Sequence, residues 1–337
     1  MKVLVTGAGG FLGRRIVESL LSQGVEHVRV HVRQAPPQGM VEGLRERYPS
    51  ATIDVVQANL LSRGEALAPM VQGVDCVVHA AAGMKGAAAD MFANTVLTTR
   101  NLLEAACAQN VRRIVLISSF SVYEAASLKK GQMLSEKTPI EKVGVDRGAY
   151  GYAKTRQEHM FNEFQRQYGF ESVILRPGVI YGPGGGALSA RIGIRAMGFF
   201  FALGNGALLP LTYVDNCADA VATAALKAPA GSSFSVVDDD VPSCRAYLKR
   251  YCRDVESMRC IPVPFWAFRL GAKLLVWYHN RSKGQLPAIF TPYIVDSMYR
   301  PLRYSNAALK AIGWIQRINT SKALEQSFKY WKDQRKA

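Results

Sequence analysis

Residues Lys2–Gly13 read KVLVTGAGGFLG, and this stretch decides the fold. The aliphatic and β-branched run that ends at Thr6 is typical of a buried strand. Glycines follow at positions 7, 10 and 13, and apolar residues with helical spacing begin at Ile16. The order of these patterns predicts a strand, a glycine turn and a helix.

The three glycines suit a phosphate-binding turn. Without a Cβ atom, the backbone at Gly7, Gly10 and Gly13 can turn tightly, approach a pyrophosphate and let the helix pack close to the strand. The helix N-terminus that follows favours negative charge. An ordinary glycine-rich turn is the alternative, but the strand before it and the helix after it favour dinucleotide binding.

Strands and helices continue to alternate along the first half of the chain. Strands are predicted at 27–32, 52–56, 75–80, 113–118 and 172–175, and helices separate most of them, notably at 90–109 and 150–168. This alternation predicts an α/β fold with a Rossmann-type doubly wound parallel sheet, covered by helices on both faces.

A change of composition after Pro177 predicts a second lobe, which opens with the glycine-rich loop YGPGGGALS at 181–189. We expect a dinucleotide-binding Rossmann domain over 1–176 and a smaller, mainly substrate-binding C-terminal lobe over 177–337. Residues 212–237 are expected to return to the first domain, because their last part has the pattern of a further strand.

The residue after the second predicted strand bears on the choice of cofactor. An NAD site usually has Asp or Glu there to bind the ribose hydroxyls. Here the residue is Arg33, and no carboxylate lies between Arg29 and Met40. A guanidinium suits a 2′-phosphate, so we expect NADP(H), with NAD as the alternative if Arg33 is only solvated.

Composition excludes several other classes of protein. The 337 residues carry a net charge of +16, but the 42 basic residues are dispersed and form no known nucleic-acid motif, so no nucleic-acid partner is expected. The six cysteines include no C-x-x-C pair and no clustering with histidine, which predicts reduced thiols and no metal site. No signal-peptide pattern follows Met1, and Arg269 and Lys273 interrupt the longest apolar window, so a cytoplasmic location is expected.

The stretch AYGYAKT at 149–155 holds a second candidate site. Tyr150 and Lys154 are four residues apart and share one face of a helix, whereas Tyr152 points elsewhere and is expected to pack. A lysine ammonium beside a phenol favours phenolate, which would let Tyr150 exchange a proton with a substrate. The alternative is that the pair only shares a helix face. His79, at the end of a predicted strand, is expected to be packed or to support the site indirectly.

Seven short motifs then occur in the order found in one family. They are TGAGGFLG (6–13), DCVVHAAA (75–82), NTVLTTRNLLEAA (94–106), SSFSVY (118–123), YGYAK (150–154), RPGVIYGPG (176–184) and YVDNCADA (213–220). With them, nearly the whole chain resembles the extended short-chain dehydrogenase/reductases, also described as the NAD-dependent epimerase/dehydratase superfamily. The resemblance implies an active site of Ser119, Tyr150 and Lys154, in which Lys154 also holds the cofactor ribose.

The same resemblance implies the residues that contact the cofactor. They are Gly7, Gly10, Phe11, Leu12, Gly13, Arg33, Asn59, Leu60, Ala80, Ala81 and Ala82, with Pro177, Gly178 and Val179 on the nicotinamide side. The sequence departs from the family pattern at Asn59, where relatives often carry Asp, and at Glu124, where a glycine often follows the tyrosine. A homodimer through the fourth and fifth helices is usual in the family and is expected here.

Two enzyme classes share this machinery, and a redox-sensing binding protein on the same fold is a third, non-enzymatic alternative. Nucleotide-sugar members commonly bind the diphosphate with an arginine in a segment that here reads GNGALLPLTYV at 204–214, so Arg191 or Arg195 would have to replace it. A redox-sensing binding protein would tend to lose the Tyr-Lys pair. The second lobe is similar in layout to the 3β-hydroxysteroid dehydrogenases and related ketoreductases. We therefore expect an NAD(P)-dependent oxidoreductase that interconverts a secondary alcohol and a ketone on a hydrophobic small molecule, with a nucleotide-sugar epimerase or dehydratase as the alternative.

Two apolar stretches of the second lobe, at 197–204 and 262–278, have more than one interpretation. Such stretches form buried core or a dimer interface, but Arg269 and Lys273 also border aromatic and aliphatic residues as in an interfacial helix. We expect peripheral contact with a membrane surface from which an apolar substrate reaches the site.

Overall fold

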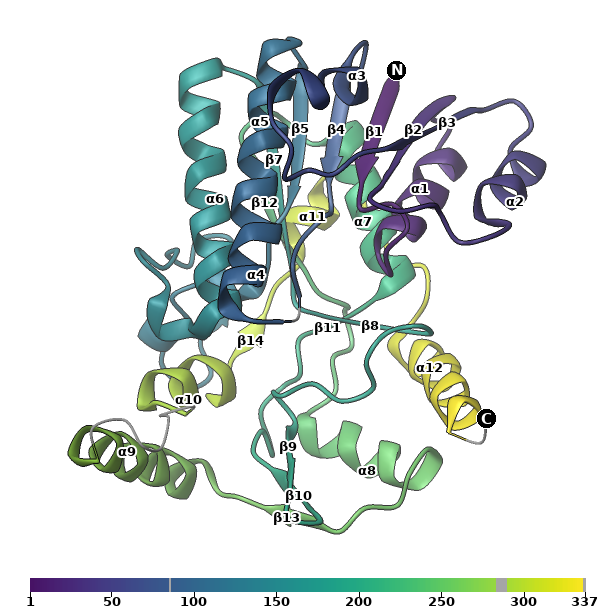
Figure 1. The fold of residues 1–337 in the computed structure, drawn as a ribbon. Coiled ribbons are helices and arrows are strands. Elements are labelled where there is room, and N and C mark those ends of the chain that lie inside the picture. The colour runs from purple at the N-terminus through teal and green to yellow at the C-terminus, as the bar shows by residue number, and fades with distance from the viewer. Residues whose placement is uncertain (85, 283–289, 336–337) are drawn as a thin grey trace.

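The computed structural model describes residues 1–84, 86–282 and 290–335. A parallel β-sheet forms its centre (Figure 1). Seven strands lie in the order β12-β7-β5-β4-β1-β2-β3, and every pair of neighbours is parallel. Their bounds are β1 Lys2–Thr6, β2 His27–Val32, β3 Thr52–Gln57, β4 Cys76–His79, β5 Arg113–Ile117, β7 Glu171–Pro177 and β12 Ser232–Val236. The doubly wound sheet predicted from the sequence is therefore confirmed.

Helices cover both faces of the sheet, because alternate side chains of each strand point to opposite faces. Val3 and Val5 pack with α1 (Gly13–Ser22) and α7 (Val214–Lys227) on one face. Leu4, between them, packs on the other face with side chains of three other helices. These are α3 (Ala68–Val71), α5 (Thr98–Ala108) and α6 (Gly148–Tyr168), and they are seen beside the strands in Figure 1.

Shorter elements complete this part of the molecule. The helices α2 (Met40–Arg47) and α11 (Ala307–Ala311) add side chains to the core of the α1–α7 face. The predicted helix at 90–109 is divided: α4 (Ala88–Phe92) continues through a π-helical segment at Ala93–Leu97 into α5. A one-turn 3-10 helix, Phe120–Val122, follows β5.

The second lobe contains strands that the sequence did not predict. A three-stranded sheet joins β9 (Gly193–Ala196), β10 (Phe199–Ala202) and β13 (Cys260–Pro262), and β8 (Val179–Tyr181) pairs with β11 (Leu211–Tyr213). Their core includes residues of α8 (Cys244–Asp254) and α12 (Thr320–Gln334). The remaining elements are α9 (Phe265–Arg281), α10 (Pro292–Tyr299) and a short ladder of β6 (Met133–Leu134) with β14 (Arg303–Tyr304).

The chain leaves the seven-stranded sheet and later returns to it. It leaves at the end of β7 and returns with β12, so residues before and after the segment 178–231 belong to one sheet. The division at 1–176 and 177–337, with the return of 212–237, stays a prediction. Among the residues that the structure describes, no helix is both long and apolar enough to cross a membrane.

Candidate active site

The glycine turn lies between β1 and the N-terminus of α1. Gly7 has a φ of +68°, which L side chains rarely adopt. Gly10 donates its N–H to the carbonyl oxygen of Gly7 at 2.9 Å, and a Cβ on Gly13 would lie 2.1 Å from that same oxygen. The turn therefore requires glycine at both ends, and the free N–H groups of the helix start next to it.

The end of β4 meets this turn. A Cβ on Gly7 would lie 3.0 Å from the backbone nitrogen of Ala81, so the two backbones are in close contact. Ala81 donates its N–H to Oγ1 of Thr6 at 3.3 Å. The structure thus brings the glycine turn together with Ala80, Ala81 and Ala82, as the fold requires of neighbouring parallel strands.

A histidine that sequence reasoning missed fixes the same region. His31 is buried in β2, accepts the N–H of Gly7 on Nδ1 at 3.4 Å, and contacts the carbonyl oxygen of Ala58 with Nε2 at 3.0 Å. Burial lowers the pKa of His31, which keeps the ring neutral and able to act as both donor and acceptor. The ends of β1, β2 and β3 are therefore linked by one side chain, for which the sequence carries no motif.

The other predicted cofactor residues on this side lie at the carboxyl ends of β2 and β3. Arg33 directly follows β2 and is exposed. Asn59 is exposed after β3, and its Oδ1 accepts the N–H of Leu61 at 3.1 Å. Leu60 is buried, and its carbonyl oxygen accepts from Nδ2 of Asn101 at 3.0 Å. All three lie at the edge of the sheet that carries the glycine turn.

The predicted nicotinamide side follows β7. Gly178 has no room for a side chain, since a Cβ would lie 2.2 Å from the carbonyl oxygen of Pro210. Val179 lines a pocket of about 210 Å³ in the second lobe, and Pro177 ends the strand before it. Most of that lining is apolar or aromatic and includes Ile180, Tyr181, Leu188, Ile192, Leu209, Leu211 and Tyr247.

Phe11 and Leu12, at the start of α1, face the second lobe. The ring of Phe11 packs against the glycine loop, where a Cβ on Gly185 would lie 2.7 Å from its Cζ. Leu12 packs against the cores of both lobes. These contacts set the distance between the glycine turn and the loop that follows β8.

Ser119, Tyr150 and Lys154 meet at the end of β5. Ser119 caps the 3-10 helix with Oγ, which accepts the N–H of Ser121 at 3.1 Å. Burial raises the pKa of Tyr150, and a hydrogen bond with Ser119 opposes this shift. Lys154 donates from Nζ to the carbonyl oxygen of Ile117 at 2.9 Å. Burial lowers the pKa of Lys154 to about 8, against the opposing charge of Glu158.

A chain of buried hydrogen bonds runs from Lys154 towards the glycine turn. Nζ of Lys154 donates to Oε1 of Gln157 at 2.9 Å, and Nε2 of Gln157 donates to Oγ1 of Thr99 at 2.7 Å. His79 contacts Thr99 with Nε2 at 2.8 Å and Thr6 with Nδ1 at 2.7 Å. His79 is thus a buried link between the two candidate sites, and burial lowers its pKa to about 3.

The direction of these bonds follows from the hydroxyl of Thr99. That hydroxyl donates to the carbonyl oxygen of Thr95 at 2.5 Å, so it accepts from both His79 and Gln157. His79 therefore carries its proton on Nε2 and accepts the hydroxyl proton of Thr6 on Nδ1. Sequence reasoning missed Thr99 and Gln157, although the position of Gln157 three residues after Lys154 on one helix was a usable signal.

Two further side chains of α6 are structural. Tyr152 stacks on Phe92 with ring centroids 5.9 Å apart, as expected of a packing residue. Glu158 pairs with Arg176 of β7 at 2.5 Å inside the protein, and also accepts from Oγ of Ser118 at 2.5 Å. These bonds anchor the helix that carries Tyr150 and Lys154 to the sheet.

Arg147, three residues before Tyr150, is a buried cation that sequence reasoning also missed. It donates Nε–H to the carbonyl oxygen of Ser121 at 3.1 Å, and Oε1 of Glu141 lies 4.0 Å from the same nitrogen. Its Nη1 and the hydroxyl of Ser121 are buried without a hydrogen-bond partner in the described part of the chain. Burial and the charge of Arg191 lower the pKa of Arg147 to about 10.

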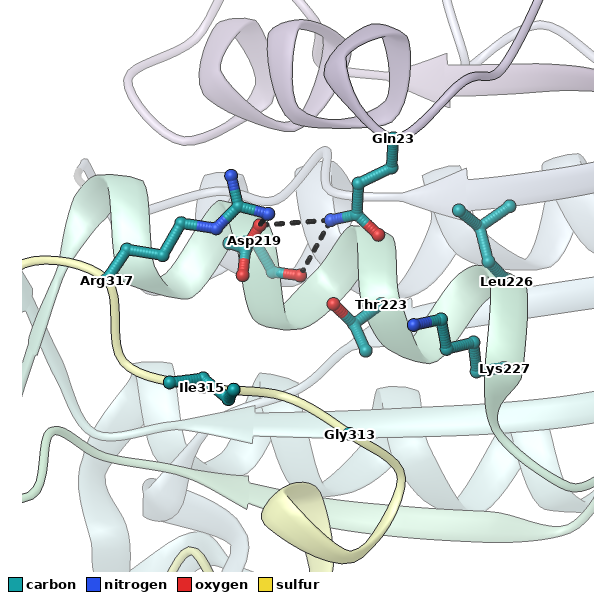
Figure 2. Close-up of a pocket in the computed structure, with 8 residues that line it drawn as sticks. All are labelled: Gln23, Asp219, Thr223, Leu226, Lys227, Gly313, Ile315 and Arg317. Atoms are coloured by element: carbon teal, nitrogen blue, oxygen red, sulfur yellow. Dashed lines mark hydrogen bonds and ion pairs between the residues drawn. The ribbon is translucent and has the colours of Figure 1, made fainter.

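A larger pocket of about 510 Å³ lies elsewhere, and Figure 2 shows its lining. Gln23 from the C-terminal end of α1 and Arg317 both bind Asp219 of α7, at 3.0 and 2.8 Å. The glycine turn is at the opposite end of α1, so this pocket is remote from the candidate active site. Its ion pair holds the segment around Arg317 against α7, which is a structural role.

Comparison with known proteins gives one matching family and several similar chains. A family model described as the NAD dependent epimerase/dehydratase family matches residues 3–236. A 2-alkyl-3-oxoalkanoate reductase of Stenotrophomonas maltophilia is 27% identical, over 97% of this chain and 98% of that protein. The 4-hydroxy-2-methyl-3-oxo-4-farnesyl-3,4-dihydroquinoline-1-oxide ketoreductase of Stigmatella aurantiaca is 26% identical, over 86% and 84% of the two chains.

A solved structure shows the same fold. The dTDP-glucose 4,6-dehydratase DesIV of Streptomyces venezuelae, crystallised with NAD, superposes with a TM-score of 0.73 over 100% of this chain and 98% of that one, at 18% identity. The chain is therefore similar in sequence to two proteins named as reductases, and it shares its fold with a protein named as a dTDP-glucose dehydratase.

Proposed function

Because the chain belongs to the NAD-dependent epimerase/dehydratase family, it is an enzyme of that family, and we propose that it interconverts a secondary alcohol and a ketone on a hydrophobic substrate. The observation that carries this proposal is the meeting of Tyr150, Ser119 and buried Lys154 at the end of β5. Buried hydrogen bonds link this group to Thr6, directly before the glycine turn. The nicotinamide, when bound, supplies or accepts the hydride.

The three side chains have separate tasks in the proposed reduction. The phenol of Tyr150 gives its proton to the substrate oxygen, and Ser119 holds that oxygen with a hydrogen bond. The ammonium of Lys154 stabilises the phenolate that remains. Gln157 and the carbonyl of Ile117 hold two of the three Lys154 protons, which leaves the third for the ribose or for Tyr150. In the oxidation of an alcohol, the same protons move in reverse.

We propose NADP(H) as the preferred cofactor. The glycine turn and the contact of Gly7 with Ala81 fit a dinucleotide, and Arg33 is exposed at the position that faces the adenosine ribose in this fold. NAD remains the alternative, since the similar dehydratase was crystallised with it.

The proposed substrate is a 3-oxo acid with alkyl chains, or the corresponding hydroxy acid. The apolar pocket beside Val179 suits an alkyl chain, and the similar Stenotrophomonas protein is named for such substrates. The unpaired Nη1 of Arg147, three residues before Tyr150 in the chain, supplies an N–H that a carboxylate can accept. The nucleotide-sugar epimerase or dehydratase is the second candidate.

The test uses the oxidation direction, because 3-oxo acids lose carbon dioxide readily. We expect NADP-dependent oxidation of a 2-alkyl-3-hydroxyalkanoate, and a weaker reaction with its methyl ester. Arg147→Gln should raise KM for the acid about tenfold or more and leave the ester unchanged, since one charged hydrogen bond is lost. Equal effects on acid and ester would contradict the carboxylate contact. Turnover of a UDP-sugar, but of no hydrophobic alcohol or ketone, would overturn the substrate class.

We also propose a homodimer formed through α5 and α6, together with peripheral contact between the protein and a membrane. The two helices cover one face of the sheet (Figure 1), and Leu97 and Tyr168 beside or on them are exposed. Size-exclusion chromatography with light scattering should give twice the chain mass, and Leu97→Glu should shift it towards the monomer. A wild-type monomer at all concentrations would contradict the dimer.

A further inference from the structure

Helix α9 exposes large apolar side chains that a water-soluble surface rarely carries together. Trp266, Leu270, Leu274 and Trp277 are 71%, 52%, 58% and 61% exposed, and only Ala272 of this helix is buried. Their spacing of four, four and three residues places all four on one side of the helix. We call this set the α9 stripe.

Two residues of α9 outside the α9 stripe attach the helix to α10. Arg269 binds Asp296 of α10 through two nitrogens, with Nε–Oδ1 at 3.0 Å and Nη2–Oδ2 at 3.2 Å. Phe268 packs edge-on against Tyr299 of α10, with ring centroids 5.1 Å apart. Phe268 lies on the side of the helix opposite the α9 stripe. Arg269 lies at the flank of the stripe with 41% of its side chain exposed, so both contacts with α10 leave the α9 stripe pointing outward.

Charge along this part of the chain favours one kind of partner. No Asp or Glu occurs between Glu256 and Asp296. Lys273 and Arg281 are exposed on α9 itself, next to the α9 stripe. Tryptophan with leucine, bordered by lysine and arginine, is the composition of helices that lie in the interface of an anionic bilayer. A second copy of the same surface would instead bring these cations together.

Helix α9 also lies at an accessible end of the molecule. In Figure 1, both α9 and the β9–β10 hairpin lie at the end of the molecule away from the N-terminus. Met197, at the tip of this hairpin, is 83% exposed. Its partner α10 reaches the segment before Tyr150, because Tyr293 of α10 donates a hydrogen bond to Glu141. The exposed helix is thus connected, through α10, to the segment that precedes the proposed active-site helix.

We propose that α9 binds the surface of anionic membranes, with the α9 stripe inserted among the headgroups and Lys273 and Arg281 on lipid phosphates. The net charge of +16 adds a longer-range attraction that salt weakens. The proposed membrane contact is argued from helix α9 alone. The delivery of an apolar substrate from the bilayer rests on the proposed function as well.

The experiment is flotation of the full-length protein with phosphatidylcholine vesicles, with and without phosphatidylglycerol, at low and high salt. Wild type should float with the anionic vesicles at low salt. Trp266→Ser with Trp277→Ser should reduce the bound fraction at least about tenfold, and Lys273→Glu with Arg281→Glu should do the same through charge. Ile315→Ser is the matched control, because Ile315 is 74% exposed at the remote pocket of Figure 2.

Three outcomes would overturn the proposal. The first is that wild type does not float with any vesicles, and the second is that wild type floats but both double variants float equally well. The third is that wild type is a dimer that binds no lipid and the tryptophan variant is a monomer, which would assign the α9 stripe to contact with a second copy. Turnover of a water-soluble short-chain substrate is measured in parallel and should be equal in all variants. If wild type floats with anionic vesicles but turns over no secondary alcohol or ketone, the proposed function is rejected and the membrane contact is still supported.

Discussion

At the scale of single residues, Tyr150 is the most direct test of the proposed chemistry. Tyr150→Phe removes only the hydroxyl, so the fold and cofactor affinity should remain while turnover falls at least about a hundredfold. Lys154→Met should reduce both turnover and cofactor affinity, since Lys154 is proposed to serve the phenol and the ribose. Steady-state kinetics and cofactor titration measure the two effects, and a Tyr150→Phe enzyme with more than about a tenth of wild-type activity would rule out the assignment.

Arg33 decides the cofactor. If its guanidinium binds the 2′-phosphate, Arg33→Ala should weaken NADPH about 10- to 100-fold, the worth of a charge-assisted hydrogen bond, and leave NADH unchanged. Fluorescence titration of both cofactors gives the affinities. Equal wild-type affinities, unaffected by the substitution, would show that Arg33 is only a solvated residue.

The sequence predicted some residues of the candidate site and not others, for a physical reason. Gly7, Tyr150 and Lys154 sit in short motifs whose spacing carries information. His31 and Arg147 have no such spacing, because each acts through a partner far away in the chain, as with His31 and Ala58. Only the packed sheet brings such groups together. The roles of the motif residues in catalysis stay predictions.

At the scale of an element, two helical glycines, Gly13 in α1 and Gly43 in α2, offer a matched comparison. Gly13→Ala would place a Cβ on the carbonyl oxygen of Gly7, so the turn must open. We expect the free energy of unfolding to fall by about 1–3 kcal/mol and cofactor binding to be lost. Gly43→Ala in α2 meets no neighbouring atom and should stabilise the protein by about 0.5–1 kcal/mol. Urea denaturation of both variants checks this, and equal effects would contradict it.

Elements with a strong period were predicted well, and irregular ones were not. The strands predicted at 27–32 and 52–56 are observed as β2, which is mostly buried, and β3, which lies at the sheet edge with only Ile53 buried. The β9–β10–β13 sheet was missed, because its strands have three or four residues and β13 is far along the chain from its partner. Helix α9 shows the opposite limit: its apolar composition was plain, but only the structure shows that most of it is exposed.

At the scale of the whole molecule, stability in acid should depend on buried histidines. The pKa of His79 is about 3, below its usual value of 6.5, so the fold favours the neutral ring. The contribution of the neutral His79 ring to the free energy of unfolding is fully present above about pH 6.5, the pKa of histidine in the unfolded chain. It is lost as the pH falls from about 6.5 towards 3, by about 1.4 kcal/mol for each pH unit. His31 is shifted in the same direction and adds to this loss.

Substitution of His79 separates the contribution of this histidine to acid destabilisation from the contribution of the carboxylates. His79→Leu leaves the hydroxyls of Thr6 and Thr99 without their partner, so it should be less stable than wild type at neutral pH. The difference between the two proteins should then shrink as the pH falls from 6 to 4. Urea unfolding midpoints of both proteins across this pH range provide the measurement. A difference in midpoint between wild type and His79→Leu that does not change with pH would contradict the predicted role of His79.

The return of the chain to β12 has a consequence for synthesis on the ribosome. Strand β12 pairs with β7, and the whole of 178–231 is translated between them. A nascent chain that has emerged only to residue 231 has six strands of the sheet and an open edge along β7, with backbone groups that can pair with another chain. Chains stalled at that length should therefore aggregate or bind chaperones, whereas chains stalled once β12 has emerged should not. The enzyme's most vulnerable moment is thus before its last sheet strand leaves the ribosome.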